Sequence, residues 1–217
     1  MKDTLKIDIV SDVVCPWCTV GYKHLKKAID ELQIEDQIEI EWQPFELNPH
    51  MPAEGQDLTE HLTQKYGSTK EQQQASKQRL TEAGANVGFK FDYFEGMRIV
   101  NTFDAHVLLE YAKKFNKQTE LKMRLTTAFF SERKDVSKRE VLKEALLDVG
   151  LNAEEALANL TNDDARFEVQ STKQYWQNLG VRSVPTIVFN RKEAVTGAQP
   201  IEVFKSILKQ FTETSTA

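Results

Sequence analysis

Cys15 and Cys18 are the only cysteines in the chain of 217 residues, and Pro16 and Trp17 lie between them. A bridge between the two would close a very short loop and restrict the unfolded chain little, so a stabilising disulfide explains the pair poorly. Two thiols at this spacing can instead exchange disulfides with a substrate, because the second thiol can resolve the mixed disulfide formed by the first. The pair therefore predicts redox chemistry.

The dithiol follows a strand-like segment and begins a helix-like one. Residues 5–10 alternate apolar and charged side chains, whereas apolar side chains after Cys18 recur every three or four residues. Cys15 would occupy the helix N-cap, where unpaired N–H groups favour an anion, and Pro16 suits the first helical position. We expect a lowered pKa at Cys15, which attacks, and a higher pKa at the more buried Cys18, which resolves. Trp17 would be exposed beside them.

Three other interpretations of the cysteine pair remain open from the residues alone. Two thiolates are half of a tetrahedral zinc site, but the four histidines show no paired spacing, and His24 would point away from both sulfurs. The other two interpretations are that the cysteines are inert and buried, or that they are joined in a static disulfide. The position of the pair at a strand-to-helix turn favours the redox interpretation, and we expect no metal.

The elements that must position the dithiol form two halves. Residues 5–10, the helix that follows and residues 38–42 predict a strand–helix–strand unit with parallel strands. Residues 186–189, 193–196 and 201–211 predict a strand–strand–helix unit at the other end of the chain. The two halves together predict an α/β, thioredoxin-like fold.

Residues 56–165, between the halves, are predicted to be helical throughout. Asn101 and Thr102 predict the start of one helix, and Ser137 with Glu140 predicts a capping box at another. We therefore expect a thioredoxin-like domain formed by residues 1–55 and 166–217, interrupted by a large all-helical insertion. Helical periodicity is clearest in residues 110–117, 121–130, 139–149 and 153–160.

Val184 and Pro185 directly precede the predicted strand at residues 186–189. A proline at this point suits a cis peptide bond, although an ordinary trans proline that begins an edge strand is the alternative. In a thioredoxin-like fold this loop lies opposite the cysteines, and its backbone can pair with an extended substrate. We expect the Val184–Pro185 bond to be cis and both residues to support the active site.

Charge and hydropathy exclude several classes of function. The chain has 28 basic and 33 acidic residues and a formal charge of −5, which gives no basic surface for a nucleic acid. No apolar run approaches the roughly 20 residues that cross a bilayer. The first residues lack the apolar core of a signal peptide, so we expect a cytoplasmic protein with neither a membrane nor a nucleic-acid partner.

Several motifs together resemble the FrnE branch of the DsbA family. The resemblance runs from residue 7 to about residue 204 and implies a thioredoxin fold with an inserted helical domain. It also implies thiol–disulfide oxidoreductase activity on thiol- or disulfide-containing substrates, with a thiol redox partner and no cofactor beyond the Cys15–Cys18 disulfide. The matching segments are residues 11–18 (SDVVCPWC) with Gly21, 44–49 (PFELNP), 101–106 (NTFDAH), 184–190 (VPTIVFN) and 197–200 (GAQP).

The resemblance leaves alternatives for function and for some residues. Relatives in this family include isomerases, some of which use glutathione and commonly replace the first cysteine; the presence of both cysteines here favours redox chemistry. A glutathione-dependent isomerase or transferase, with glutathione as co-substrate, remains an alternative, as does a non-catalytic redox-sensing binding protein. Asn101, Phe103 and His106 would either cap and pack a helix or line the substrate cleft. Trp17 replaces the histidine of DsbA, which implies a less oxidising couple.

Overall fold

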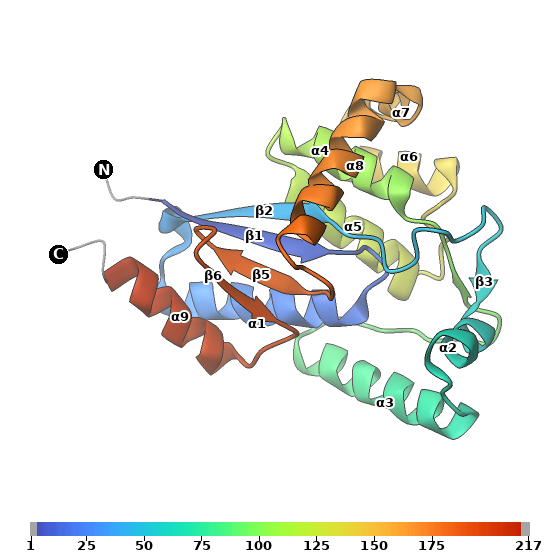
Figure 1. Ribbon diagram of the computed structural model, residues 1–217, viewed down its shortest axis with the longest axis horizontal. Coiled ribbons are helices and arrows are strands. Elements are labelled where there is room, and N and C mark those ends of the chain that lie inside the picture. Colours follow the sequence, from blue (N-terminus) through green and yellow to red (C-terminus); the bar gives the residue numbers. More distant parts are fainter. Residues whose placement is uncertain (1–3, 214–217) are drawn as a thin grey trace.

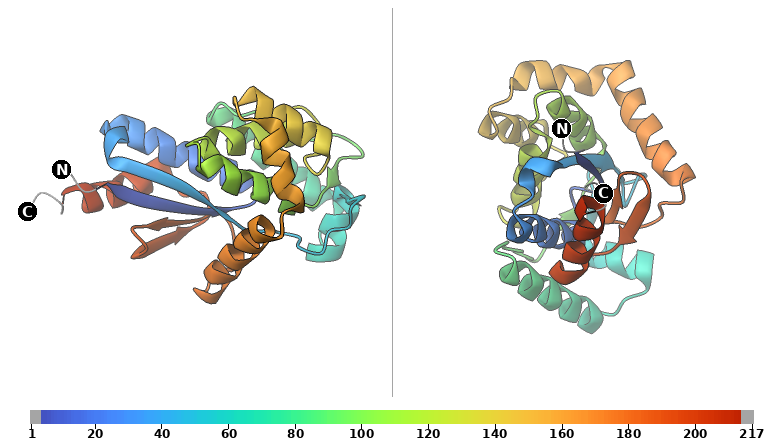
Figure 2. Two further views of the ribbon diagram at one scale, coloured as in Figure 1. Left: turned by 90° about the horizontal axis from the view of Figure 1, so that it is seen from above. Right: turned by 90° about the vertical axis from the view of Figure 1, so that its left-hand side faces the viewer.

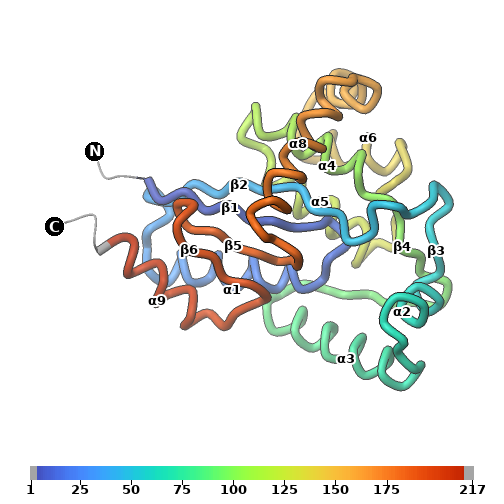
Figure 3. The backbone as a smooth tube through the Cα atoms, in the orientation of Figure 1, coloured from blue at the N-terminus to red at the C-terminus, as the bar shows by residue number. Residues whose placement is uncertain are grey.

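The computed structural model describes residues 4–213. Residues 1–3 and 214–217, at the outer ends of the predicted thioredoxin-like domain, lie outside this description. The chain leaves a central sheet after two strands, forms a series of helices, and returns to the sheet with two further strands (Figure 3). The cysteines lie where the first strand of this sheet passes into the first helix.

Within the described residues, four strands form the central sheet, in the spatial order β2 (Ile38–Pro44), β1 (Leu5–Ser11), β5 (Thr186–Phe189) and β6 (Glu193–Thr196) (Figure 1). β1 and β2 are parallel, whereas β5 is antiparallel to both of its neighbours. The parallel pair and the bounds of β5 and β6 agree with the prediction from the sequence. β1 and β2 each continue slightly beyond their predicted ends.

Two helices pack together on one face of the sheet (Figures 1 and 2). α1 (Pro16–Leu32) crosses over from β1 to β2, and α9 (Ile201–Glu213) follows β6. Ile9 on β1, Leu25 on α1 and Phe204 on α9 are fully buried in the apolar layer between them. This burial fixes α1, and with it the cysteines at its first turn, against the sheet.

The opposite face of the sheet is covered by α8 (Asp163–Asn178). Val10 on β1 and Val188 on β5 are buried against Trp176 near the end of this helix. Neighbouring residues of β1 thus point to opposite faces, as the pleat of a strand requires. α8 also spans residue 165, the predicted end of the helical insertion. The division into a thioredoxin-like domain (residues 1–55 and 166–217) and an inserted domain (residues 56–165) stays a prediction.

The helices between β2 and β5 have an apolar core of their own. Val13 and Val14, from the loop that leads to Cys15, are buried in this core rather than in the core of the sheet. The cysteine loop is therefore held from both sides. Besides α8, these helices are α2 (Leu58–Tyr66), α3 (Lys70–Asn86), α4 (Phe103–Lys113), α5 (Gln118–Phe130), α6 (Arg139–Asp148) and α7 (Ala153–Ala158), with a short 3-10 turn at Asn159–Thr161; another, Glu35–Gln37, lies between α1 and β2.

The prediction that residues 56–165 are helical throughout is wrong. β3 (Gln56–Asp57) pairs with β4 (Arg98–Ile99), and residues 87–97, called here the 87–97 segment, follow an irregular path between α3 and β4. Gly88 and Gly96 have φ values of +67° and +77°, which are incompatible with a continuous α-helix. They lie on either side of a group of aromatic residues. Those aromatic side chains pack inward against the helices instead of continuing one.

One predicted helix start differs from the structure, and another agrees with it. The capping box of Ser137 and Glu140 does not form, because α6 has Lys138 at its N-cap and the Ser137 hydroxyl donates to Asp135 Oδ1 (2.6 Å). At α4, Asn101 Oδ1 accepts from the Phe103 N–H (3.0 Å), as expected for a capping side chain. That helix begins at residue 103 with Thr102 at its N-cap, which confirms the start predicted from Asn101 and Thr102.

Gly84 is where α3 packs against the 87–97 segment, and it yields a stability prediction. A Cβ atom at this position would lie 2.4 Å from the Phe91 ring and 2.6 Å from the carbonyl oxygen of Phe89, a backbone atom that cannot rotate away. We expect Gly84→Ala to lower the free energy of unfolding by about 1–2 kcal/mol, because overpacking exceeds the ~1 kcal/mol gain in helix propensity. Urea unfolding measures the change. Arg79→Ala, at an exposed position of the same helix, is the control, and an unchanged or higher stability of Gly84→Ala would contradict the packing described here.

Candidate active site

Cys15 and Cys18 occupy the first turn of α1. Cys15 is the N-cap and Pro16 the first helical residue, as the sequence predicts. The Cys15 N–H donates to the carbonyl of Asp12 (3.3 Å), and the Cys18 N–H donates to the carbonyl of Cys15 (3.2 Å). Both thiols are free, and the exposed fractions of the two residues are 4% and 1%. The pair is therefore almost fully shielded from solvent.

The two thiols hydrogen-bond to each other, and their pKa values move in opposite directions. Burial, with the neighbouring Cys18, raises the pKa of Cys15 well above its ordinary value. Burial also opposes ionisation of Cys18, but the hydrogen bond from Cys15 and the charge of Lys122 outweigh it and lower the pKa of Cys18. This is the reverse of the order expected from the helix N-cap alone. Because the two thiols are coupled, the first ionisation belongs to the pair, and the hydrogen bond and the charge of Lys122 favour the negative charge on the Cys18 side.

Lys122, on α5, places a buried ammonium group beside the dithiol. Its Nζ donates to the Asp12 carbonyl (2.7 Å), the same oxygen that accepts from the Cys15 N–H. The residue is 3% exposed. Burial lowers its pKa, while the negative charges of Cys18, Asp12 and Cys15 act in the opposite direction. A cation in this position favours the thiolate over the thiol in both cysteines.

The Asp12 side chain ties the cysteine loop to the chain that follows β2. Its Oδ2 accepts from the Leu47 N–H (2.7 Å), and its Oδ1 lies 3.5 Å from Nε2 of His106. The pKa of Asp12 is lowered, because His106 and the Leu47 N–H outweigh the effect of burial. His106 Nε2 is itself 2.9 Å from the carbonyl oxygen of Phe45. One buried carboxylate thus holds together three segments of the chain around the dithiol.

Val184 and Pro185 lie next to Cys15. The peptide bond between them is cis, and the Val184 carbonyl oxygen lies 3.8 Å from the Cys15 Sγ. Gly21, on the second turn of α1, allows this approach, since a Cβ atom there would be 3.3 Å from the Pro185 ring and 3.3 Å from the Cα of Ala198. The structure therefore brings the cysteine motif at residues 11–18 together with the motifs at residues 184–190 and 197–200.

A cavity of about 480 Å³ opens at Cys15. Pro16, Trp17 and Val184 border it together with residues of α2, α3, α5 and the 87–97 segment, and most of its surface is apolar. Trp17 is 42% exposed, as predicted for this position. Cys18 does not border the cavity, so a small molecule in the cavity can reach the Cys15 sulfur but not the Cys18 sulfur.

Asn101, Phe103 and His106 do not border the Cys15 cavity, and a cleft-lining role for them stays a prediction. Asn101 caps α4, and His106 contacts Asp12. The Phe103 ring lies 4.7 Å from the Arg166 guanidinium. Asn101 and Phe103 border a separate hollow of about 600 Å³.

The positions of Lys122 and the Asp12 carboxylate beside the dithiol were not predicted from the sequence. A lysine within a helix of mixed polarity is expected to be exposed, and the burial of Lys122 follows from how α5 packs on the cysteine loop. Asp12 lies inside the SDVVCPWC motif, and this position is the one signal in the sequence that marks it.

Two further observations concern metal ligands and membrane-spanning helices. Among the residues that the structure describes, no three His, Cys, Asp or Glu side chains come together as metal ligands would. None of the helices in residues 4–213 is both long and apolar enough to cross a bilayer.

A sheet of this topology with two thiols at the N-terminus of α1 defines a thioredoxin-fold dithiol protein. The chain belongs to the family of DSBA-like thioredoxin domains, whose model matches residues 6–209. This confirms the predicted α/β, thioredoxin-like fold with a helical insertion and the predicted relation to DsbA. The narrower FrnE assignment stays a prediction.

Relatives of known sequence and structure match nearly the whole chain. YwbO, an uncharacterized protein of Bacillus subtilis, is 28% identical over 211 residues, which are 94% of this chain and 96% of the relative. A probable DsbA oxidoreductase from Streptomyces coelicolor is 33% identical, with a TM-score of 0.89 over 95% of this chain and 89% of that one. The cytosolic disulfide reductase DsbM from Pseudomonas aeruginosa, solved with GSH, is 15% identical, with a TM-score of 0.66 over 96% and 99% of the two chains; this likeness shows the fold alone.

The buried ammonium of Lys122 predicts a shift in thiol reactivity. Lys122→Met removes the cation that favours the thiolate, so the pKa of the dithiol should rise and the pH profile of alkylation should move to higher pH. Each unit of that rise lowers the thiolate fraction near pH 7 about tenfold. The free energy of unfolding of this variant should not fall correspondingly, because a buried charge is replaced by an apolar group. Lys117→Met, at a lysine whose ammonium pairs with Glu120 near the surface, is the control. An unchanged pH profile in Lys122→Met would show that the ammonium does not act on the sulfurs.

Proposed function

We propose that the protein is a thiol–disulfide oxidoreductase in which Cys15 attacks the substrate and Cys18 resolves the mixed disulfide. The observation that carries this proposal is the position of the sulfurs. Cys15 borders the cavity beside Trp17 and Val184, whereas Cys18 lies behind it, away from the cavity. A substrate sulfur can therefore reach Cys15 first.

The hydrogen bond between the thiols supplies a route for the first step. The Cys15 proton passes to the Cys18 thiolate, and the resulting Cys15 thiolate attacks one sulfur of a substrate disulfide. A bond forms between Cys15 and that sulfur, the substrate S–S bond breaks, and the other half leaves as a thiolate. This reconciles the raised pKa of Cys15 with its role, because its neighbour holds the charge until a substrate arrives.

The second step closes the cycle. Cys18 loses its proton, which the departing substrate thiolate can take up, and attacks the Cys15 sulfur of the mixed disulfide. The second substrate half leaves as a thiolate, which takes up a proton from water, and Cys15 and Cys18 are joined. The substrate disulfide has gained two electrons and the protein has lost them. The reverse sequence oxidises a dithiol substrate.

A thiol redox partner would return the protein to its dithiol form. Glutathione is the first partner to test, and the likeness in fold to a cytosolic disulfide reductase solved with GSH supports that choice and a cytoplasmic setting. Retention of both cysteines supports redox chemistry over isomerisation, because the second thiol can resolve a mixed disulfide. Turnover of a disulfide substrate would distinguish an enzyme from a non-catalytic redox-sensing protein, which would also use both thiols.

Substitution of each cysteine separates the roles. Cys18→Ser should accumulate a mixed disulfide through Cys15, because the first attack survives and the resolving attack is lost. Cys15→Ser should form none, and neither variant should turn over a disulfide substrate in a glutathione buffer. Intact-protein mass spectrometry detects the trapped adduct, and alkylation of the reduced wild type should label Cys15 before Cys18. Trapping through Cys18, or turnover by a single-cysteine variant, would refute the assigned roles.

A further inference from the structure

The cavity at Cys15 has an unusual composition for this chain. Its floor is apolar and includes Leu58, Leu80, Met97, Ile99 and Phe130. Although the chain carries 33 acidic residues, no Asp or Glu of the described part borders this cavity. Two lysines do border it. An apolar space with positive charge alone fits an apolar molecule that carries a negative group.

The two lysines are Lys65, near the end of α2, and Lys77, on α3. The Lys65 Nζ donates to the carbonyl of Leu47 and to Oδ1 of Asn48, at 2.8 Å each, and both acceptors are uncharged. Lys65 is exposed and Lys77 is half-buried, and neither forms an ion pair with any residue that the structure describes. No carboxylate opposes their charge within the Cys15 cavity, whereas an adjoining hollow that Lys77 also borders is lined by Asp57, Glu82, Asp92 and Glu95.

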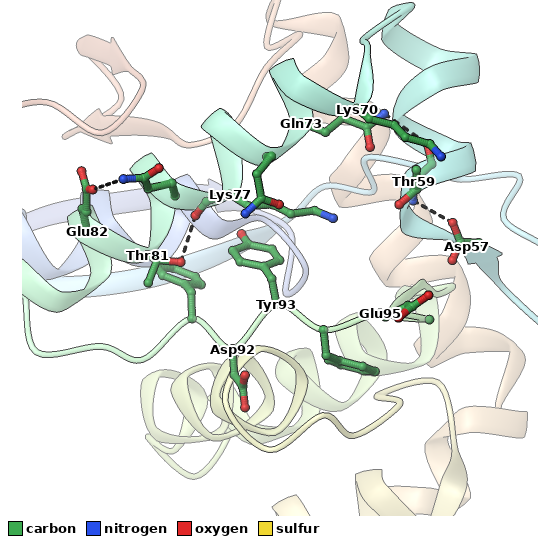
Figure 4. Close-up of a pocket in the computed structure, with 15 residues that line it drawn as sticks. Asp57, Thr59, Lys70, Gln73, Lys77, Thr81, Glu82, Asp92, Tyr93 and Glu95 are labelled. Atoms are coloured by element: carbon green, nitrogen blue, oxygen red, sulfur yellow. Dashed lines mark hydrogen bonds between the residues drawn. The ribbon is translucent and has the colours of Figure 1, made fainter.

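Tyr93, on the 87–97 segment, adds a hydrogen-bond donor without a partner. Its hydroxyl oxygen is buried and forms no hydrogen bond within the described residues. Burial, and to a smaller extent the nearby Cys15, raise its pKa, so the hydroxyl keeps its proton. Figure 4 shows its ring pointing from that segment toward α3, where Lys77 lies; both residues also border an adjoining polar hollow of about 940 Å³. Leaving such a hydroxyl unpaired is unfavourable, and an acceptor on a ligand would satisfy it.

The rim of the cavity is aromatic. Trp17 and Tyr66 are 42% and 62% exposed on its border, and the Lys65 Nζ lies 5.4 Å from the centroid of the Tyr66 ring. The volume of about 480 Å³ falls within the range of small-molecule sites. These features describe an entrance and a chamber for a small molecule with an apolar or aromatic body.

We propose that the substrate of Cys15 is a small, largely apolar disulfide that carries a carboxylate, together with the thiol formed from it. The carboxylate is held by Lys65 or Lys77 and by the Tyr93 hydroxyl, the apolar body occupies the chamber, and one sulfur meets Cys15. This inference rests on the proposed function and uses the same two exchange steps. Cys15 bonds to the near sulfur, the far half leaves as a thiolate, and Cys18 then releases the bound half.

The test compares disulfide probes of different charge on the Cys18→Ser variant, in which the first step stops at the mixed disulfide. Dithiobis(nitrobenzoate) is an aromatic disulfide with a carboxylate on each half, dithiodipyridine is a neutral aromatic one, and cystamine is cationic. Each second-order rate is divided by the rate of the same probe with free cysteine, which removes the probe's intrinsic reactivity. We expect the normalised rates to fall in the order anionic, neutral, cationic.

The lysines and the tyrosine are then changed in the same background. Lys65→Gln combined with Lys77→Gln should lower the ratio of the anionic to the neutral rate about tenfold. Tyr93→Phe should lower this ratio about threefold without loss of stability, because the hydroxyl it removes has no partner in the protein. Lys70→Gln, at a lysine that borders the adjoining hollow but not the Cys15 cavity, is the matched control and should leave the ratio unchanged.

The outcomes separate this inference from the function beneath it. Equal normalised rates for the three probes, or a ratio unaffected by the paired lysine substitutions, would overturn the proposed substrate class while leaving Cys15 as a working nucleophile. A faster normalised reaction with glutathione disulfide, or with a disulfide in an unfolded peptide, would overturn it as well. If no probe forms a mixed disulfide with Cys15, the proposed function itself fails.

Discussion

The arrangement of the site depends on a single backbone oxygen, the carbonyl of Asp12. It accepts both the Cys15 N–H and the Lys122 ammonium, and so joins the first turn of α1 to α5 at the point where the sulfurs lie. A buried ammonium is unfavourable unless nearby negative charge compensates it, and here that charge comes from Asp12 and the dithiol. Lys122 is therefore stabilised by the same ionisation that makes the cysteines reactive.

This contact makes the helical segment part of the active site. Val13 and Val14 are buried in the helical core, and the Asp12 carboxylate is fixed by the Leu47 N–H and by His106 on α4. The sheet alone would position α1, but it would leave the cysteine loop without its cation and without the surroundings that lower the Asp12 pKa. An insertion that is continuous with the dithiol in this way can tune the redox couple as well as cover it.

The sequence was sufficient for those features that a short run of residues determines. The cysteine pair, the strands at 186–189 and 193–196, and the approach of Val184–Pro185 to Cys15 follow from local patterns and from the handedness of a strand–helix–strand unit. The order of the thiol pKa values did not follow. The N-cap argument considers the helix dipole alone, whereas burial and the hydrogen bond between the thiols depend on packing from α5 and the 87–97 segment. Tyr93 and Lys122 belong to that packing, and no periodicity in the sequence marks them.

Chemistry and selectivity are supplied by different parts of the insertion. The cation that acts on the sulfurs comes from α5, whereas the side chains that a ligand would meet come largely from α2, α3 and the 87–97 segment. Because Lys122 does not border the Cys15 cavity and Lys65 and Lys77 do not contact the dithiol, a change in either group leaves the other in place. Replacement of residues on α2 and α3 could therefore alter which disulfides reach Cys15 while the buried charge cluster around Asp12 keeps the thiols reactive. A fold divided in this way can serve substrates of different shape and charge with one reaction centre, because access and reactivity are set by separate helices.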